Sequence, residues 1–250
     1  MISDTQIPYH DSRAIKNLIG FIHDWYPDEV VHIGDLMDYP QPSRWNKDTR
    51  GEFEGSIYKD SEAGKRFLGD IRSKYRGPFK VIEGNHDQRP AEYLNKYAPA
   101  LSGATTFDLD ELLDFDGHGI ELVRGFYDFA PDWTMTHGHL GFSLSQIAGR
   151  TAQNAANKIG KSVIIGHTHR LALSSESVGY NGQVITRTGM EVGHLMDMRK
   201  ASYLKHGAGN WQKGFGLVYQ DGSKVTPVPV PVQKDGTFVV ESDVFGRKAA

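Results

Sequence analysis

Four short apolar runs of this chain each end in glycine or histidine and lead directly into polar residues. They read EVVHIG, FKVIEG, WTMTHG and SVIIGH, at residues 29–34, 79–84, 133–138 and 162–167. Apolar runs of this length that stop at turn residues predict buried strands. A fifth, shorter run opens the chain and ends at Asp4. We therefore expect five strands whose ends carry side chains unsuited to a hydrophobic core.

Helical periodicity separates these strands. Residues 11–26 place apolar side chains at helical spacing, and residues 143–160 begin with a Ser143 cap signal and end in Gly160. Strands that alternate with helices predict an α/β architecture.

The last third of the chain carries the turn signals of antiparallel strands. The tripeptide YNG at 180–182 predicts a hairpin, and DG at 221–222 and again at 235–236 predicts two further turns. The repeat PVPVPV at 227–232 predicts an edge strand. We expect antiparallel strands to close the fold.

Length and composition are those of an ordinary globular protein. The 250 residues predict a single domain, 1–250, and the net charge of -3 gives no electrostatic reason to bind a membrane surface. The absence of cysteine excludes disulfides and thiolate metal sites and predicts a cytoplasmic location. The charged opening residues predict no signal peptide, and no apolar run approaches the roughly 18 residues of a membrane span.

Side chains that bind metals follow every expected strand. The carboxyl ends of strands line the crevice where open α/β sheets bind ligands, and glycine at such a turn lets the backbone approach closely. Carboxylate, amide and imidazole groups without thiolates suit Mn²⁺, Mg²⁺, Fe²⁺ or Zn²⁺. The residues at these ends are Asp4, Asp35, Asp38, Asn85, His86, Asp87, His137, His139, His167 and His169.

In this order, the motifs GDxxD from Gly34, GNHD from Gly84, HG from His137 and GHxH from Gly166 resemble those of the calcineurin-like metallophosphoesterase family. The sequence is most similar to small members from bacteriophages and bacteria. The resemblance implies a four-layer αββα sandwich of two mixed sheets, with two metal ions at the loop ends between the sheets.

The resemblance also implies a role for each matching residue. Asp35 would bridge both ions. His86 would face the substrate without binding metal, and Asp38 would orient its ring. The remaining ligands would be Asp4 and His169 for metal one, and Asn85, His137 and His167 for metal two.

One motif departs from the family pattern. The family opens with Asp-x-His, whereas this chain has Asp4-Thr5-Gln6. The amide oxygen of Gln6 is a weaker ligand than imidazole for most transition metals. We expect Gln6 or a water molecule to complete metal one, with His10 as an alternative ligand.

Two segments outside the motifs are expected to select the substrate, as insertions at about 39–75 and 189–214. The first mixes basic and aromatic residues, which suits a nucleotide or a nucleic-acid strand, although a helix with a charged face has the same composition. In the second, two hypotheses stand side by side. One set of residues would flank the metals, namely Glu191, His194, Tyr203, His206 and Trp211. Another would pack in the core or in a dimer interface, namely Met190, Leu195 and Met196.

Four residues near the motifs are candidate substrate contacts. Arg89 and Arg170 each follow a metal motif and would bind a phosphate with two hydrogen bonds, or form structural salt bridges instead. His139 and His194 complete the set.

Together these residues predict an enzyme with two divalent ions, preferably Mn²⁺, that hydrolyses phosphoesters by attack of a metal-bridging hydroxide. His86 would protonate the leaving oxygen. The chain is not strongly basic, which favours phosphodiester bonds of nucleotides, with DNA or RNA nuclease as the second hypothesis and phosphoprotein phosphatase as the third. A degenerate fold that only binds a partner is the non-enzymatic alternative. No membrane partner is expected, and the sequence leaves the oligomeric state open.

Overall fold

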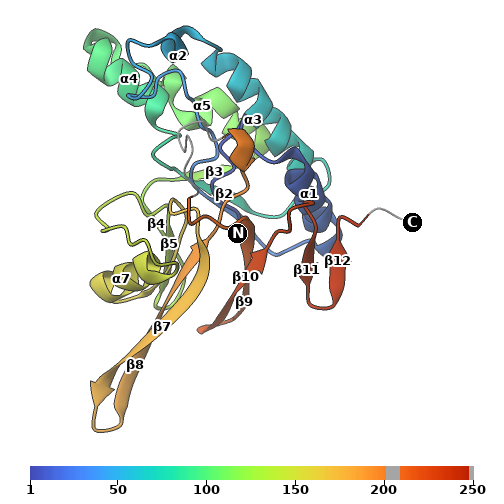
Figure 1. Cartoon of the computed structure of the whole chain (residues 1–250), viewed down its shortest axis with the longest axis vertical. Coiled ribbons are helices and arrows are strands. Elements are labelled where there is room, and N and C mark those ends of the chain that lie inside the picture. Colours follow the sequence, from blue (N-terminus) through green and yellow to red (C-terminus); the bar gives the residue numbers. More distant parts are fainter. Residues whose placement is uncertain (201–208, 248–250) are drawn as a thin grey trace.

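The computed structural model describes residues 1–200 and 209–247 (Figure 1). A three-stranded parallel sheet has the order β1 (Val30–Ile33), β2 (Phe79–Ile82) and β3 (Glu121–Val123). A five-stranded mixed sheet has the order β4 (Phe126–Ala130), β5 (Trp133–Thr136), β6 (Ser162–Ile165), β8 (Gln183–Val192) and β7 (Leu171–Tyr180). Two antiparallel pairs follow, β9 (Gly214–Asp221) with β10 (Lys224–Pro231) and β11 (Phe238–Val240) with β12 (Asp243–Phe245). The four longer predicted strands and the mixed α/β architecture are confirmed.

The opening residues connect the parallel sheet to the C-terminal strands. The backbone N–H of Ile2 donates to the carbonyl oxygen of Val31 at 2.9 Å. The N–H of Gly216 in β9 donates to the carbonyl oxygen of Met1 at 2.9 Å. The expected opening strand is therefore reduced to an isolated bridge at Ile2. Its position between β1 and β9 places Asp4 at the same end of the sheet as the residues that follow β1.

The helices are α1 (Ser12–Trp25), α2 (Arg50–Phe53), α3 (Ile57–Arg72), α4 (Arg89–Tyr97), α5 (Leu109–Leu113), α6 (Phe115–His118) and α7 (Arg150–Ile159), with 3-10 turns at Pro99–Leu101, Thr105–Phe107 and Met198–Lys200. The helix expected at 11–26 is confirmed as α1. Asp11 caps it, because its Oδ1 accepts the N–H of Arg13 at 3.0 Å. Among the described residues, no helix has the length and apolar content to cross a membrane.

The helix expected at 143–160 begins at Arg150, so the Ser143 cap is wrong. Gly149 has a φ of +82°, a left-handed conformation that glycine adopts readily and that does not continue a helix. The buried carboxylate of Glu191 takes the place of a cap and accepts the N–H of Thr151 at 3.1 Å. A side chain from a distant strand therefore fixes where α7 starts.

Three hydrophobic clusters hold the layers together. The first packs α1 and α3 against the parallel sheet and includes Leu68 and Val81. The second lies between the two sheets and includes Ile82 and Ile164. The third packs α7 against β6 and includes Ala156.

The predicted turns differ in outcome. The hairpin at 180–182 is confirmed, since Tyr180 pairs with Gln183 across the turn, and DG at 221–222 joins the paired strands β9 and β10. The repeat at 227–232 lies mostly in β10, which pairs with β9 alone among the described strands, so the edge strand is confirmed. The DG at 235–236 forms a turn, but β10 and β11 on either side of it share no ladder.

The expected insertion at 39–75 is in part a core element. Its second half forms α3, whose side chains at Phe67, Leu68 and Ile71 are buried against the parallel sheet. The part before α3, which holds α2, is more exposed: Tyr39 belongs to the first cluster, but Trp45 and Phe53 face solvent.

We predict that Leu68→Ala lowers the free energy of unfolding by about 2–5 kcal/mol, because it leaves a cavity in the first cluster. Tyr58→Ala is the control on the same helix, since Tyr58 is 57% exposed, and it should change stability by no more than about 0.5 kcal/mol. Urea unfolding measures both. Equal stability of the two variants would contradict the assignment of α3 to the core.

Candidate metal centre

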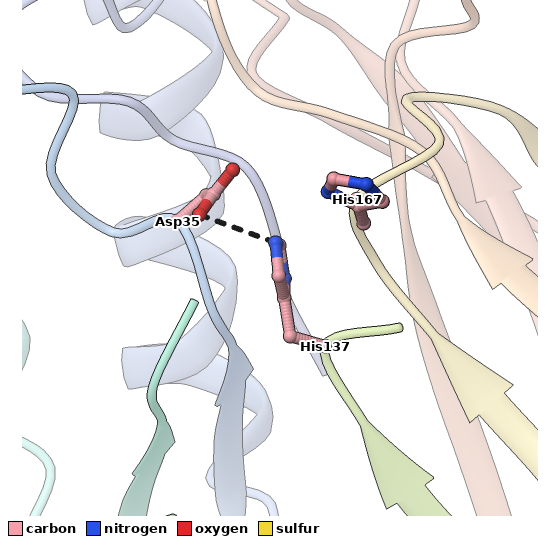
Figure 2. A group of neighbouring side chains, drawn as sticks. All are labelled: Asp35, His137 and His167. Atoms are coloured by element: carbon pink, nitrogen blue, oxygen red, sulfur yellow. Dashed lines mark ion pairs between the residues drawn. The ribbon is translucent and has the colours of Figure 1, made fainter. Parts of the chain in front are cut away.

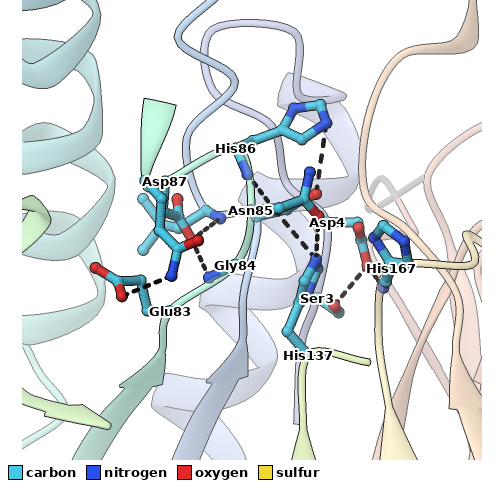
Figure 3. A network of polar contacts seen from close by, with 12 residues as sticks. Ser3, Asp4, Glu83, Gly84, Asn85, His86, Asp87, His137 and His167 are labelled. Atoms are coloured by element: carbon cyan, nitrogen blue, oxygen red, sulfur yellow. Dashed lines mark hydrogen bonds and ion pairs between the residues drawn. The ribbon is translucent and has the colours of Figure 1, made fainter. Parts of the chain in front are cut away.

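Loops from both sheets meet at the carboxyl ends of four strands (Figure 3). Asp35 follows β1, Asn85 follows β2, His137 follows β5 and His167 follows β6. One ligand atom each from Asp35, His137 and His167 lies within 4.8 Å of the other two (Figure 2). The strands therefore bring these expected ligands to one point.

The hydrogen bonds of His137 explain why the group of Asp35, His137 and His167 attracts a cation. Its Nδ1 donates to the carbonyl oxygen of Ile33 at 2.8 Å, which leaves the lone pair of the neutral ring on Nε2. Nε2 lies 3.1 Å from Asp35 Oδ1 and 3.2 Å from Asn85 Oδ1. Three electron-rich atoms thus face one another in the interior. A proton or a metal ion between them is needed to balance their repulsion.

The charges at this point shift the pKa values of the residues around it. Burial opposes ionisation of Asp35, but the charge of His137 outweighs it and holds the pKa of Asp35 well below its usual value. Burial likewise opposes a charged His137, but Asp35 raises the pKa of His137 to about 9. Burial, reinforced by the charge of His137, lowers the pKa of both His167 and His139 to about 4. His167 and His139 are therefore neutral at pH 7, the form in which imidazole binds metals.

A second group of expected ligands surrounds Nε2 of His169. This atom lies 3.2 Å from Asp4 Oδ1 and 3.1 Å from the amide nitrogen of Gln6. Rotating the amide by 180° exchanges its nitrogen and oxygen, so Gln6 can present an oxygen at the same place. The other oxygen of Asp4 accepts the hydroxyl of Ser3 at 2.5 Å and the N–H of His167 at 3.0 Å. Asp4 thereby links the second group to the first.

Most of the expected ligands share an uncommon backbone conformation. Those with φ between +45° and +63° are Asp4, Gln6, Asp35, His167 and His169. This left-handed region costs a residue with a side chain on the order of 1–2 kcal/mol. Such strain persists only where the surrounding structure fixes it, and it clusters at functional sites.

Two motif glycines lie where no side chain fits. A Cβ on Gly84 would lie 2.2 Å from the backbone nitrogen of Asp35. A Cβ on Gly166 would lie 2.0 Å from Ser3 Oγ and 2.9 Å from Asp4 Oδ2. The glycines therefore allow the ligand-bearing loops to touch.

His86 lies between a carboxylate and a guanidinium. Its Nδ1 donates to Asp38 Oδ1 at 2.9 Å, and its Nε2 accepts an N–H of Arg89 at 3.0 Å. Arg89 also donates to the carbonyl oxygen of Asp38 at 2.5 Å. Burial works against a charged His86, but Asp35 and Asp38 raise its pKa. The expected pairing of Asp38 with His86 is present, and Arg89 reaches the ring atom that Asp38 leaves free.

The other candidate substrate contacts are placed differently. His139 lies beside the first group, with its ring 5.3 Å from that of His137, and neither ring nitrogen has a hydrogen-bond partner. His194 is buried next to the second group, 5.6 Å from the ring of His169. Arg170 turns away and donates to Gln146 at 3.2 Å.

Residues 189–214 contribute both packing and a wall of the site. Met190, Leu195 and Met196 are fully buried, as the packing hypothesis for this segment expects. The ring of Trp211 lies 4.3 Å from that of His169. Tyr203 and His206 lie outside the described residues. His10 pairs its backbone with Met196, and in the described part of the chain no hydrogen bond joins it to an expected ligand.

Asp87 has a role that sequence reasoning missed. Its carboxylate accepts the N–H of Gly84 at 2.9 Å and that of Met37 at 2.8 Å, and so ties the loop after β2 to the loop after β1. Burial, reinforced by the charge of Asp35, raises the pKa of Asp87 to about 7. Its position within GNHD was the available signal, because a fourth polar residue in that loop needs partners of its own.

Comparison with known proteins identifies the family. A family model described as calcineurin-like phosphoesterase matches residues 1–171. The chain belongs to this family. It is also 51% identical over 248 residues to the Gene 54 protein of Mycobacterium phage D29, covering 98% of this chain and 97% of the relative. The Gene 54 protein of Mycobacterium phage L5 is 50% identical over the same lengths.

Membership of the calcineurin-like phosphoesterase family supports metal-dependent hydrolysis of phosphoesters. The residues present fit a divalent ion, since buried oxygen and imidazole atoms converge without enough donors to satisfy them. The family match ends at Leu171, so His194 and Trp211 come from a part of the chain that it does not cover.

We predict that Gly166→Ala lowers metal affinity by about 10–100-fold, the usual effect of disturbing the residues that hold ligands, because the new methyl group displaces Ser3 and Asp4. The control is Gly20→Ala within α1, where nothing lies within 4 Å of the added Cβ. Metal content after dialysis, alongside circular dichroism, measures the effect. Unchanged metal content in folded Gly166→Ala would show that this contact does not support the site.

Proposed function

We propose that this protein is a dinuclear metal-dependent phosphodiesterase that acts on nucleotides. The observation that carries the proposal is the link between the two ligand groups, since one oxygen of Asp4 faces His169 and the other holds the loop of His167. Metal one would be held by Asp4, Gln6, Asp35 and His169, and metal two by Asp35, Asn85, His137 and His167. Mn²⁺ suits this mixture of oxygen and imidazole ligands.

The wider architecture is consistent with this proposal. The three hydrophobic clusters separate helices, sheet, sheet and helix, which supports a four-layer αββα sandwich. We propose that residues 1–250 form one domain of this kind.

The chemistry divides between the ions and the protein. Two bound divalent ions would stabilise charge on the phosphoryl oxygens and lower the pKa of a water molecule between them. The chain itself supplies His86, whose ring Asp38 holds through Nδ1 so that Nε2 faces the site. Arg89 lies at that Nε2. When a phosphate oxygen takes the Arg89 N–H, Nε2 is free to take up a proton from solvent, and Asp35 and Asp38 favour the charged ring that results. That ring can then deliver its Nε2 proton to the leaving oxygen.

The balanced charge of the segment before α3 and an aromatic ring beside His169 favour a small diester over a long polyanion. The segment 44–54 balances its basic residues Arg44, Lys47 and Arg50 with Asp48, Glu52 and Glu54. Lys47 lies 2.6 Å from Glu52, so its charge is already paired. Trp211, packed on His169, offers an aromatic wall for the base of a nucleotide.

A substrate panel tests the function. We predict that chelator-stripped protein is inactive and that Mn²⁺ restores hydrolysis of a chromogenic diester and of cyclic nucleotides more than of the matching monoester or of DNA. Zn²⁺ should restore less. Diester hydrolysis in excess chelator would overturn the metal dependence, and preference for single-stranded DNA would replace the small-substrate assignment by a nuclease.

We predict that His86→Ala keeps its metals but loses about 10²–10⁴-fold in kcat, the usual contribution of a general acid. The loss should shrink for substrates with acidic leaving groups, which need no proton. Asp38→Asn is the matched variant, and its kcat should fall less than that of His86→Ala, since the amide oxygen can still accept a hydrogen bond from the His86 ring. Loss of metal from His86→Ala, by elemental analysis, would make His86 a ligand instead.

We predict that Gln6→His tightens one of two unequal metal sites, because imidazole replaces an amide beside His169. Activity at limiting Mn²⁺ should rise by about tenfold, within the range typical of changes around metal ligands, while activity at saturating Mn²⁺ stays the same. Calorimetric titration of both proteins with Mn²⁺ measures this. Two equally tight sites in the natural chain would contradict it.

A further inference from the structure

The outer part of the β7–β8 hairpin, residues 175–188, projects from the rest of the protein as an arm (Figure 1). β8 pairs with β6 only at residues 189–191, so no described strand pairs with the arm besides its own two. Its base touches α7, where Asn157 donates to Glu176 at 2.7 Å, and the part beyond that contact is an uncovered two-stranded ribbon. Its side chains are exposed along nearly its whole length. A two-stranded ribbon without a covered face is marginally stable in water.

The arm carries apolar side chains that a solvent-exposed ribbon does not need. Tyr180 is 79% exposed, and Val184, Ile185 and Val178 are also exposed. Val178 lies directly across the ladder from Ile185, so the two form a continuous apolar strip. Burial of this strip requires another surface.

The free edge of β7 is open to strand pairing. Every second residue of an edge strand presents its N–H and C=O outward, and proteins protect such edges with proline or lysine. This chain protects its other long edge strand, β10, with Pro227, Pro229 and Pro231. The stretch from Ser177 to Tyr180 in β7 has no such residue.

Charge decides what can cover the arm. Its two charged residues, Glu176 and Arg187, lie opposite each other in the ladder, so the arm is neutral. A neutral apolar edge has nothing to attract nucleic acid or an anionic membrane. An identical neutral edge is complementary to it, because antiparallel pairing about a two-fold axis matches a strand with itself.

We propose that the arm is a dimerisation surface, on which a second copy of this chain pairs β7 against β7 in antiparallel register about a two-fold axis at Val178. In this register Val178 faces Val178 of the partner subunit, and Glu176 faces Tyr180 of the partner subunit. No like charges meet, and the apolar strips of the two arms join. The proposal concerns a part of the chain that supplies no expected metal ligand, and it is independent of the proposed activity.

Val178→Cys tests the register directly, because the chain has no cysteine of its own. Facing residues of antiparallel strands have Cα atoms about 4.5–5.5 Å apart, within the distance that a disulfide spans. Mild oxidation of dilute protein should convert Val178→Cys into a covalent dimer. The control, Val239→Cys at a 52% exposed position of β11, should form no covalent dimer. Equal cross-linking of both variants, or none of Val178→Cys, would overturn the register.

Sedimentation of the unmodified protein tests dimerisation without cross-linking. We expect a dimer, and Val178→Lys should raise its dissociation constant by about tenfold or more, since two lysines would face each other across the axis. Val239→Lys should leave the dimer intact, and circular dichroism reports that both variants are folded. A monomer at all accessible concentrations, or dissociation by both substitutions alike, would overturn the proposal.

Discussion

Electron-rich atoms crowded into the protein interior are the constraint on which the site depends. The neutral ring of His137 donates its one N–H, at Nδ1, to the carbonyl oxygen of Ile33. Its other nitrogen, Nε2, therefore presents a lone pair to the oxygens of Asp35 and Asn85. Such a cluster is stable only with positive charge at its centre. Burial opposes a proton on Nε2 of His137, but Asp35 favours it and raises the pKa of His137 to about 9. A divalent ion would displace this proton, and metal binding should therefore release protons.

The fold supports this crowding with backbone geometry. Asp4, Asp35 and His169 adopt left-handed conformations in the loops that hold the expected ligands. Gly84 and Gly166 let these loops touch. The strain is sustained by the hydrogen bonds of buried strands and by the apolar clusters on both faces of the sheets.

Sequence reasoning found the strands and the residues at their ends because both depend on local pattern. Short apolar runs specify the buried strands, and the topology of parallel strands then brings their carboxyl ends together. It failed where distant residues decide. Glu191 caps α7 from another strand, which no local signal at Ser143 reveals. Arg89 was expected near the site, but sequence could not show that it reaches Nε2 of His86, because that contact depends on where α4 begins after the loop of β2. The roles of the site residues in binding metal and substrate stay predictions.

Anomalous diffraction from crystals soaked in Mn²⁺ tests the central claim most directly. The account predicts two peaks, one among Asp35, Asn85, His137 and His167 and a weaker one beside Asp4 and His169. It also predicts that His86 and Arg89 touch neither ion. A single peak, or a peak that includes His86, would contradict the account.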